Sequence, residues 1–281
     1  MNKVVIVANS NKTLAIKLAK EVMQFLSSKK IDSHIMYTQD STYEVDSSLK
    51  PDAVVSIGGD GTLLSVVYNF HTFHVPIFAI NAGDLGFITP FSVDDWKNGL
   101  NEFINGRASI KSKLLLKATV YLNNEKIKTG IALNEISVQK DETNHLLRLD
   151  AFLENECFAH GLAADGVIIA TPTGSTAYSM SAGGSVLSSD TDAFIFTPNS
   201  PFMAIDRGIV FPAKSVIKIR ISEKQKASSA LVSADGVPIF HLNKSHELVI
   251  KKLEGECRMV ANPTLSDASR IGEKMMWKPL G

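Results

Sequence analysis

Residues 54–62 read VVSIGGDGT, an apolar run that leads directly into a glycine-rich turn. The apolar part has the length and composition of a buried strand, and Leu63 to Val67 have the pattern of a helix. Glycine permits positive φ angles and a close approach of a ligand, and N–H groups at a helix start attract phosphate oxygens. The stretch therefore predicts either a phosphate-binding turn in which Asp60 acts chemically, or a tight turn in which Asp60 only caps the helix.

A second glycine-rich loop follows the next predicted strand. Residues 76–80 form a buried apolar run, and residues 81–87 read NAGDLGF. Loops that follow parallel strands emerge at the carboxyl edge of the sheet, where open α/β sheets bind ligands. The second loop therefore favours a phosphate-binding role for the first.

Strands and helices alternate around these two loops. Strands are predicted at 2–9, 33–38, 53–57 and 76–80, and helices at 13–29, after residue 61 and from residue 96 onward. Ser92, with Asp95 three residues later, is a helix-start signal. The alternation predicts a Rossmann-like α/β domain with a parallel sheet over residues 1–107.

Beyond Ala108 the chain consists mainly of short β-type runs. Strands are predicted at 114–122, 127–138, 146–153, 167–171, 193–197, 216–221 and 248–252, with a turn at Asn123-Asn124. Residues 108–263 are therefore predicted to form a mostly-β domain. Helical spacing from Leu265 to Trp277 predicts a last helix, through which residues 264–281 would complete the first domain.

The most polar stretch of the second domain is residues 165–184, which read DGVIIATPTGSTAYSMSAGG. A buried strand here leads into hydroxyl groups, small residues and one Tyr. This composition suits hydrogen bonding to a base and a ribose, and it lets a flat ring lie close to the backbone. The alternative is a Ser/Thr-rich surface turn, which the adjoining apolar strand makes less favourable.

Composition and absent motifs exclude several classes of protein. Lys plus Arg and Asp plus Glu balance at 29 each, so no overall field favours nucleic acid or an anionic membrane. Cys157 and Cys257 have neither CxxC nor zinc-type spacing, and the histidines form no metal motif. The sequence also lacks GxxxxGK[ST], a GxGxxG after the first strand, and GxSxG. With no signal peptide and no apolar run of membrane-spanning length, we expect a soluble, cytoplasmic protein.

Five motifs together resemble the NAD kinase family in both residues and order. They are GGDGT at 58–62, NxGxLGF at 81–87, Asn134-Glu135, the block 165–184, and ADG at 234–236. The resemblance implies a nucleotide cleft between the two domains and transfer of a phosphoryl group from ATP to the adenosine ribose 2′-hydroxyl of NAD, giving NADP. It also implies Mg²⁺ or another divalent cation with the ATP, a homo-oligomer (dimer or tetramer), and no nucleic-acid or membrane partner.

The same resemblance implies roles for individual residues. Asp60 would be the general base that faces the 2′-hydroxyl, and the ATP phosphates would lie against Gly58, Gly59, Gly61 and Thr62. The residues implied in NAD binding are Asp60, Gly61, Phe87, Asn134, Glu135, Asp165, Thr173, Thr176, Ala177, Tyr178, Ser181 and Asp235.

One departure from the family pattern concerns the acceptor. Many members carry a basic residue two positions before the Asp that matches Asp165, whereas this chain has Ala163. NADH therefore stays open as a second acceptor. Two alternative functions are a lipid (diacylglycerol-type) kinase and a non-catalytic dinucleotide sensor. The 165–184 block argues against the first, and the presence of Asp60 argues against the second.

Overall fold

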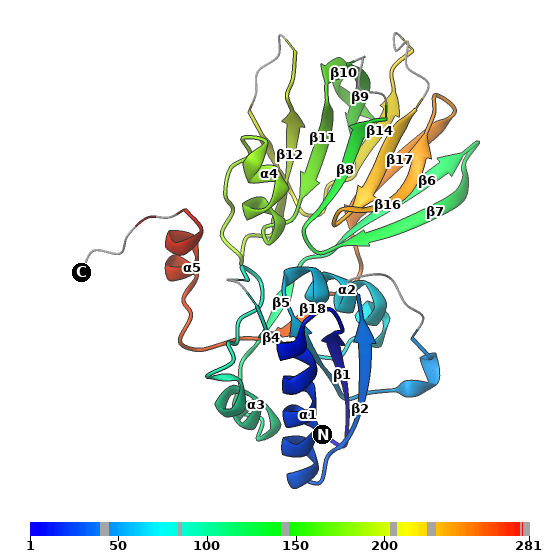
Figure 1. The fold of residues 1–281 in the computed structure, drawn as a ribbon. Helices are drawn as coiled ribbons and strands as arrows, with labels where there is room; N and C mark the ends of the chain where they lie inside the picture. Colours follow the sequence, from blue (N-terminus) through cyan, green and yellow to red (C-terminus); the bar gives the residue numbers. More distant parts are fainter. Residues whose placement is uncertain are drawn as a thin grey trace. The chain divides into compact units, whose positions relative to one another are not determined.

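The chain divides into two compact units in a computed structural model (Figure 1). The structure describes residues 1–39, 45–83, 86–141, 146–202, 207–223, 229–275 and 277, so Asp84 and Leu85 of the second glycine loop lie outside the described residues. The first unit comprises Met1–Lys113 and Glu256–Gly281, and the second comprises Leu114–Gly255. The sequence patterns placed these two boundaries near residues 107 and 263.

The first unit is built on a six-stranded sheet in the order β2-β1-β3-β4-β18-β5. Its strands are β1 (Lys3–Asn9), β2 (Asp32–Thr38), β3 (Ala53–Gly58), β4 (Ile77–Asn81), β5 (Ile110–Lys113) and β18 (Cys257–Val260). Strands β1 to β4 run parallel, which confirms the predicted parallel sheet. The patterns did not predict β5 and β18, and it is β18 that brings the end of the chain back into this sheet, beside β4.

Helices cover both faces of the parallel strands. They are α1 (Thr13–Ser28), α2 (Asp60–Phe70) and α3 (Trp96–Ile104), with short 3₁₀ turns η1 (Ser47–Leu49) and η2 (His71–Phe73). The last helix of the unit, α5 (Asp267–Lys274), follows β18 in the chain. Val4, Ile6 and Ala8 pack in one cluster with α1 and α3, while α2 packs against β3 and β1. Burial on both faces explains why β1, β3 and β4 are mostly apolar, whereas the edge strand β2 is polar and largely unburied. None of the helices in the described ranges has the length and apolar character needed to cross a membrane.

The predicted helix-start signal at Ser92 forms hydrogen bonds, but Ser92 is not the N-cap of α3 as predicted: the N-cap is Asp95, and its side chain makes no capping bond to the helix. The Ser92 backbone N–H donates to the Asp95 carboxylate at 2.6 Å, and the Trp96 N–H donates to the Ser92 carbonyl at 3.2 Å. The Asp95 carboxylate thus reaches back to the Ser92 N–H, as the acidic residue of a capping box does.

The second unit contains two six-stranded sheets, in the orders β10-β9-β14-β17-β6-β7 and β13-β12-β11-β8-β15-β16. The strands are β6 (Leu116–Leu122), β7 (Glu125–Ala132), β8 (Glu135–Lys140), β9 (Leu147–Leu153), β10 (Glu156–Ala164), β11 (Gly166–Ala170), β12 (Ala193–Asn199), β13 (Ile209–Pro212), β14 (Ile217–Ile221), β15 (Ala230–Ala234), β16 (Val237–Leu242) and β17 (His246–Lys252), and two short helical pieces are η3 (Gly174–Thr176) and α4 (Tyr178–Ser181). Val120 and Leu248 of the first sheet share one core with Val138 and Phe196 of the second. The mostly-β character of this unit is confirmed.

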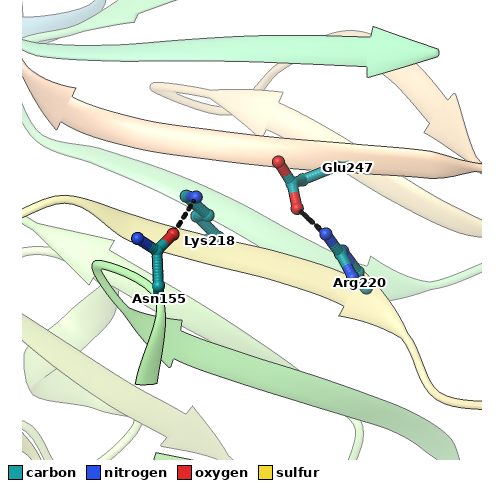
Figure 2. Close-up of polar contacts among 4 residues, drawn as sticks. All are labelled: Asn155, Lys218, Arg220 and Glu247. Carbon is teal, nitrogen blue, oxygen red and sulfur yellow. Dashed lines mark hydrogen bonds and ion pairs between the residues drawn. The ribbon is translucent and has the colours of Figure 1, made fainter. Parts of the chain in front are cut away.

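The outer face of the first of these sheets is polar. On β14, Ile217 and Ile219 are buried in the core, whereas the alternate residues Lys218 and Arg220 point outward. Figure 2 shows Lys218 Nζ donating to Asn155 at 2.7 Å and the Arg220 guanidinium pairing with the Glu247 carboxylate. Exposed pairs of this kind contribute little to stability, so the inward residues hold the sheet in place.

The strand predicted at 127–138 is wrong at its centre. Strand β7 ends at Ala132 and β8 begins at Glu135, and the two strands belong to different sheets. The apolar pattern continues through Leu133, but the backbone N–H groups at this point donate to a side chain, Asp235, instead of to a neighbouring strand. The break places Asn134 and Glu135 at a bend.

Candidate active site

The two glycine-rich loops of the first unit leave neighbouring strands. Strand β3 pairs with β4 in parallel, with Gly58 opposite Asn81, and the Ala82 N–H donates to the Gly58 carbonyl at 2.8 Å. This confirms the prediction that both loops emerge from the same edge of the sheet. Residues of the two loops can therefore act on one ligand.

Gly58 is required by the packing of the first turn of α2. A Cβ atom on Gly58 would collide with the side chain of Thr62, which is fully buried. The Thr62 hydroxyl lies 3.3 Å from Asn9 Nδ2 and accepts its hydrogen bond, which ties the turn to the end of β1. Thr62 thus lies beneath the loop and braces it from below.

Asp60 links the two loops. It is the first residue of α2, and its carboxylate accepts the N–H groups of Phe87 at 2.8 Å and Ile88 at 3.1 Å. The Thr89 hydroxyl donates a longer bond of 3.4 Å. The interpretation of Asp60 as a mere helix cap is wrong, because the N-cap is Gly59 and the Asp60 carboxylate bonds to the other loop. A carboxylate has about four acceptor positions, so one stays open for a further hydroxyl donor.

In the second unit, Asp235 shapes the bend that carries Asn134 and Glu135. It lies in the turn between β15 and β16, with φ +48° followed by Gly236 at +79°. Its carboxylate accepts the backbone N–H groups of Leu133 at 2.8 Å, Asn134 at 2.8 Å and Glu135 at 3.0 Å. Burial raises the pKa of Asp235 to about 6, although the three N–H donors oppose the shift. Asp235, which the sequence predicts in the NAD site, therefore holds the backbone of Asn134 and Glu135 in place.

The bend presents two buried acceptor atoms. Glu135 Oε2 and Asn134 Oδ1 are both buried, and neither has a hydrogen-bond partner among the described residues. Burial and, secondly, the charge of Asp235 raise the pKa of Glu135 to about 8. Buried polar atoms without partners are rare in proteins and call for an explanation. Hydroxyl or amino groups of a ligand would satisfy both.

The block 165–184 packs against the same bend. The Thr171 N–H donates to the Asn134 carbonyl at 2.8 Å, and the Thr171 hydroxyl donates to the Leu133 carbonyl at 2.5 Å. Gly174 has no room for a side chain, because a Cβ atom would strike the Asn134 backbone. The structure therefore brings together two motifs that lie more than thirty residues apart in the sequence.

Tyr178 and Asp165 are held by residues that the sequence patterns missed. The Tyr178 hydroxyl accepts from Gln139 at 3.1 Å and Asn199 at 2.8 Å, and Lys140 Nζ bonds to Asp165 at 2.5 Å. Burial, and then the charges of Asp165 and Glu135, raise the pKa of Tyr178. Gln139 and Asn199 both pair with Gly166 in the β-ladders, a signal available only from strand register.

Comparison with known proteins assigns this arrangement to a family. Residues 4–108 match the N-terminal domain of ATP-NAD kinases, and residues 133–261 match their C-terminal domain. A NAD kinase of Treponema denticola is 34% identical over 277 residues, which cover 99% of this chain and 97% of that protein. A NAD kinase of Aquifex aeolicus is 30% identical over 280 residues, which cover 99% and 100%. The chain belongs to the NAD kinase family.

Solved structures of NAD kinases agree with this assignment. Yeast NADH kinase in complex with NADH has a TM-score of 0.88 at 27% identity, covering 100% of this chain and 89% of that one. An NAD kinase from Archaeoglobus fulgidus in complex with ATP shares the fold, with a TM-score of 0.78 at 22% identity over 98% of this chain and 99% of that one. The chain is therefore a kinase, and the lipid-kinase and sensor alternatives are set aside.

The remaining predicted residues lie in or beside the glycine loops of the first unit or in the block 165–184 of the second. Gly61 and Ser181 are exposed, Phe87 is 42% exposed, and Thr173 and Thr176 are linked by a 3.2 Å bond from the Thr176 hydroxyl to the Thr173 carbonyl. Ala177 joins η3 to α4, and its carbonyl accepts the Ser181 N–H at 3.4 Å. Within the described ranges, no group of three His, Cys, Asp or Glu residues could hold a metal ion.

The pKa of Glu135 predicts a pH-dependent stability. A folded-state pKa of about 8, above the ordinary 4.5, means that the folded protein binds this proton more tightly than the unfolded chain. The resulting stabilisation is complete below pH of about 4.5 and is lost as the pH rises through 8. We expect wild type to lose about 1–3 kcal/mol more than Glu135→Gln between pH 6.5 and 9 in urea unfolding. The exposed Glu125→Gln serves as the control, and identical slopes for wild type and Glu135→Gln would contradict the prediction.

Proposed function

We propose that this protein transfers the terminal phosphoryl group of ATP to the adenosine ribose 2′-hydroxyl of NAD, giving NADP, with Asp60 as the general base. The observation that carries the proposal is the position of the Asp60 carboxylate, bonded to Phe87 and Ile88 across two glycine loops with one acceptor position open. Membership of the NAD kinase family supports the choice of donor and acceptor.

The reaction requires one proton acceptor and a way to neutralise charge. The ribose hydroxyl oxygen forms a bond to the terminal phosphorus, and the bond from that phosphorus to the bridging oxygen breaks, so that ADP leaves with its electron pair. The hydroxyl proton passes to the open position on Asp60. Phosphoryl transfer needs little further covalent chemistry, so positioning and electrostatics supply most of the rate.

The ATP phosphates would lie at the start of α2. We assign their binding to the backbone of Gly58, Gly59 and Gly61, with Thr62 bracing the turn from beneath. A divalent cation such as Mg²⁺ would enter as part of the Mg-ATP substrate. Phosphate oxygens and water are its usual ligands, and its charge offsets that of the phosphates.

The adenosine part of NAD is assigned to the bend at Asn134 and Glu135. Their buried acceptor atoms would receive ribose hydroxyl or adenine amino groups. The other residues assigned to NAD binding are Asp60, Gly61, Phe87, Asp165, Thr173, Thr176, Ala177, Tyr178, Ser181 and, as a support, Asp235.

NADH is proposed as a second acceptor. Ala163 places no charge two positions before Asp165, and Lys140 is paired with Asp165 itself. A neutral side chain at position 163 does not by itself disfavour either redox form of the nicotinamide. The yeast enzyme of similar structure is an NADH kinase, which supports NADH as an acceptor.

The direct test is to incubate the purified protein with Mg-ATP and either NAD or NADH. We expect NADP from NAD and NADPH from NADH, and we expect EDTA to abolish both and excess Mg²⁺ to restore them. Inorganic polyphosphate in place of ATP tests the donor. Absence of any phosphorylated dinucleotide with a correctly folded protein would refute the proposed function.

We also propose, from the family resemblance, a cytoplasmic homo-oligomer, either a dimer or a tetramer. Light scattering of the purified protein measures its mass in solution and distinguishes these states from a monomer.

A further inference from the structure

Lys12 lies in the short loop that joins β1 to α1. Because β1 neighbours β3 in the sheet, this loop leaves the same edge as the glycine loop after β3. A Cβ atom on Gly59 would lie 3.4 Å from Lys12 Nζ, and one on Gly83 would collide with it. The ammonium group therefore lies against both glycine loops, the same two loops that Asp60 joins.

The Lys12 ammonium group has no anionic partner in the part of the chain that the structure describes. Lys12 is partly buried, so water has restricted access to its side chain. Asp60 is the acidic residue of the adjoining loop, but its carboxylate accepts from Phe87, Ile88 and Thr89. A partly desolvated cation without a counter-ion is unfavourable unless a ligand supplies the negative charge.

The positive charge of Lys12 does not help to form α1. Lys12 is the N-cap residue of this helix, where Ser, Thr, Asp or Asn would stabilise the first turn. It makes no capping hydrogen bond, and the first turn of α1 contains no acidic residue. A cation at this end also opposes the helix dipole. The local helix structure therefore does not explain why residue 12 is a lysine. Binding of an anionic ligand would explain it.

We propose that the Lys12 ammonium group binds the phosphate chain of the donor, beside Gly59 and Gly83. This inference rests on the proposed function, for which it names a further residue. The chain has no P-loop lysine, and Lys12 would supply an equivalent charge from a different loop. A lysine ammonium group carries three donors on a flexible stem and acts as a point charge toward phosphate. The role of Lys12 is electrostatic, and the ribose proton still passes to Asp60.

The test compares Lys12→Met with Lys12→Arg. Lys12→Met keeps an unbranched side chain and removes the charge, so we expect kcat/KM for Mg-ATP to fall by about 10- to 100-fold, the effect of losing one or more charge-assisted hydrogen bonds. The KM for NAD should change by less than about twofold. Lys12→Arg should retain most of the activity, and Lys20→Met, an exposed lysine on the same helix, should match wild type.

A second variant keeps the charge but moves it. Gly83 has no left-handed φ, so Gly83→Ala is compatible with the backbone, and its methyl group must displace Lys12 Nζ. We expect a higher KM for Mg-ATP in Gly83→Ala and no further loss when Gly83→Ala is added to Lys12→Ala. This coupling would not arise if Lys12 only supported the helix.

Binding without turnover gives an independent measurement. Inorganic tripolyphosphate should raise the melting temperature of wild type and of Lys20→Met, but much less that of Lys12→Met. Wild-type kinetic constants and a wild-type tripolyphosphate shift in Lys12→Met would overturn the assignment of Lys12. If wild type itself formed no NADP, the proposed function would fail instead, so the two failures are distinguishable.

Discussion

Asp60→Asn is expected to lower kcat for NADP formation by about 100- to 10,000-fold, the usual contribution of a general base. An amide cannot take the proton from the ribose hydroxyl, and its one oxygen can still accept the N–H of either Phe87 or Ile88, which keeps the side chain in the loop. NAD binding should therefore remain measurable. The measurements are kcat with saturating Mg-ATP and NAD, and the dissociation constant of NAD by calorimetry.

A control must separate the loss of the base from disturbance of the loops. The amide nitrogen of an Asn at position 60 would face one of the N–H donors, so some loosening of the second loop is expected. Thr89→Val removes the longest bond to Asp60, at 3.4 Å, and leaves the carboxylate intact. We expect this variant to keep kcat within about fivefold of wild type. Near-normal turnover in Asp60→Asn would show that another group accepts the proton.

The sequence predicts the first unit well because its strands are buried on both faces. Strands β1, β3 and β4 are short runs of mostly apolar residues that end at Asn or Gly, which is the pattern of a strand buried on both faces. Strands β5 and β18 escaped prediction for the opposite reason. Both have only four residues and carry Lys or Arg, and they are strands only because β5 pairs with β18 and β18 pairs with β4.

Long-range hydrogen bonds account for what the sequence could not predict in the second unit. Only the polar pair Asn134-Glu135 interrupts the apolar pattern here, and the strand ends because Asp235, about one hundred residues later, accepts three backbone N–H groups at this point. The partners of Tyr178 and Asp165 likewise come from β8 and β12. Motifs identify the residues that a ligand would contact, whereas the residues that hold them in place appear only once the strands are paired.

Asp235→Ala should destabilise the protein by about 2–4 kcal/mol and raise the KM for NAD. Three backbone N–H groups, at 2.8, 2.8 and 3.0 Å from the carboxylate, would lose their acceptor. The bend at Asn134 and Glu135 would then relax. Urea unfolding at pH 7.5 measures the free energy, and Asp141→Ala, which removes an exposed carboxylate bonded to Ser229 and His241, should cost less than about 1 kcal/mol.

The φ angle of +48° at Asp235 offers a second explanation for such a loss, because alanine disfavours the left-handed region. Two further variants separate the explanations. Asp235→Gly tolerates this φ but has no acceptor, so it should lose nearly as much stability as Asp235→Ala if the hydrogen bonds matter most. Asp235→Asn tolerates the angle and keeps one oxygen, which could still accept from Asn134 and Glu135. Asp235→Asn should therefore retain most of the NAD affinity. If Asp235→Gly were as stable as wild type, the carboxylate would not be what holds the bend.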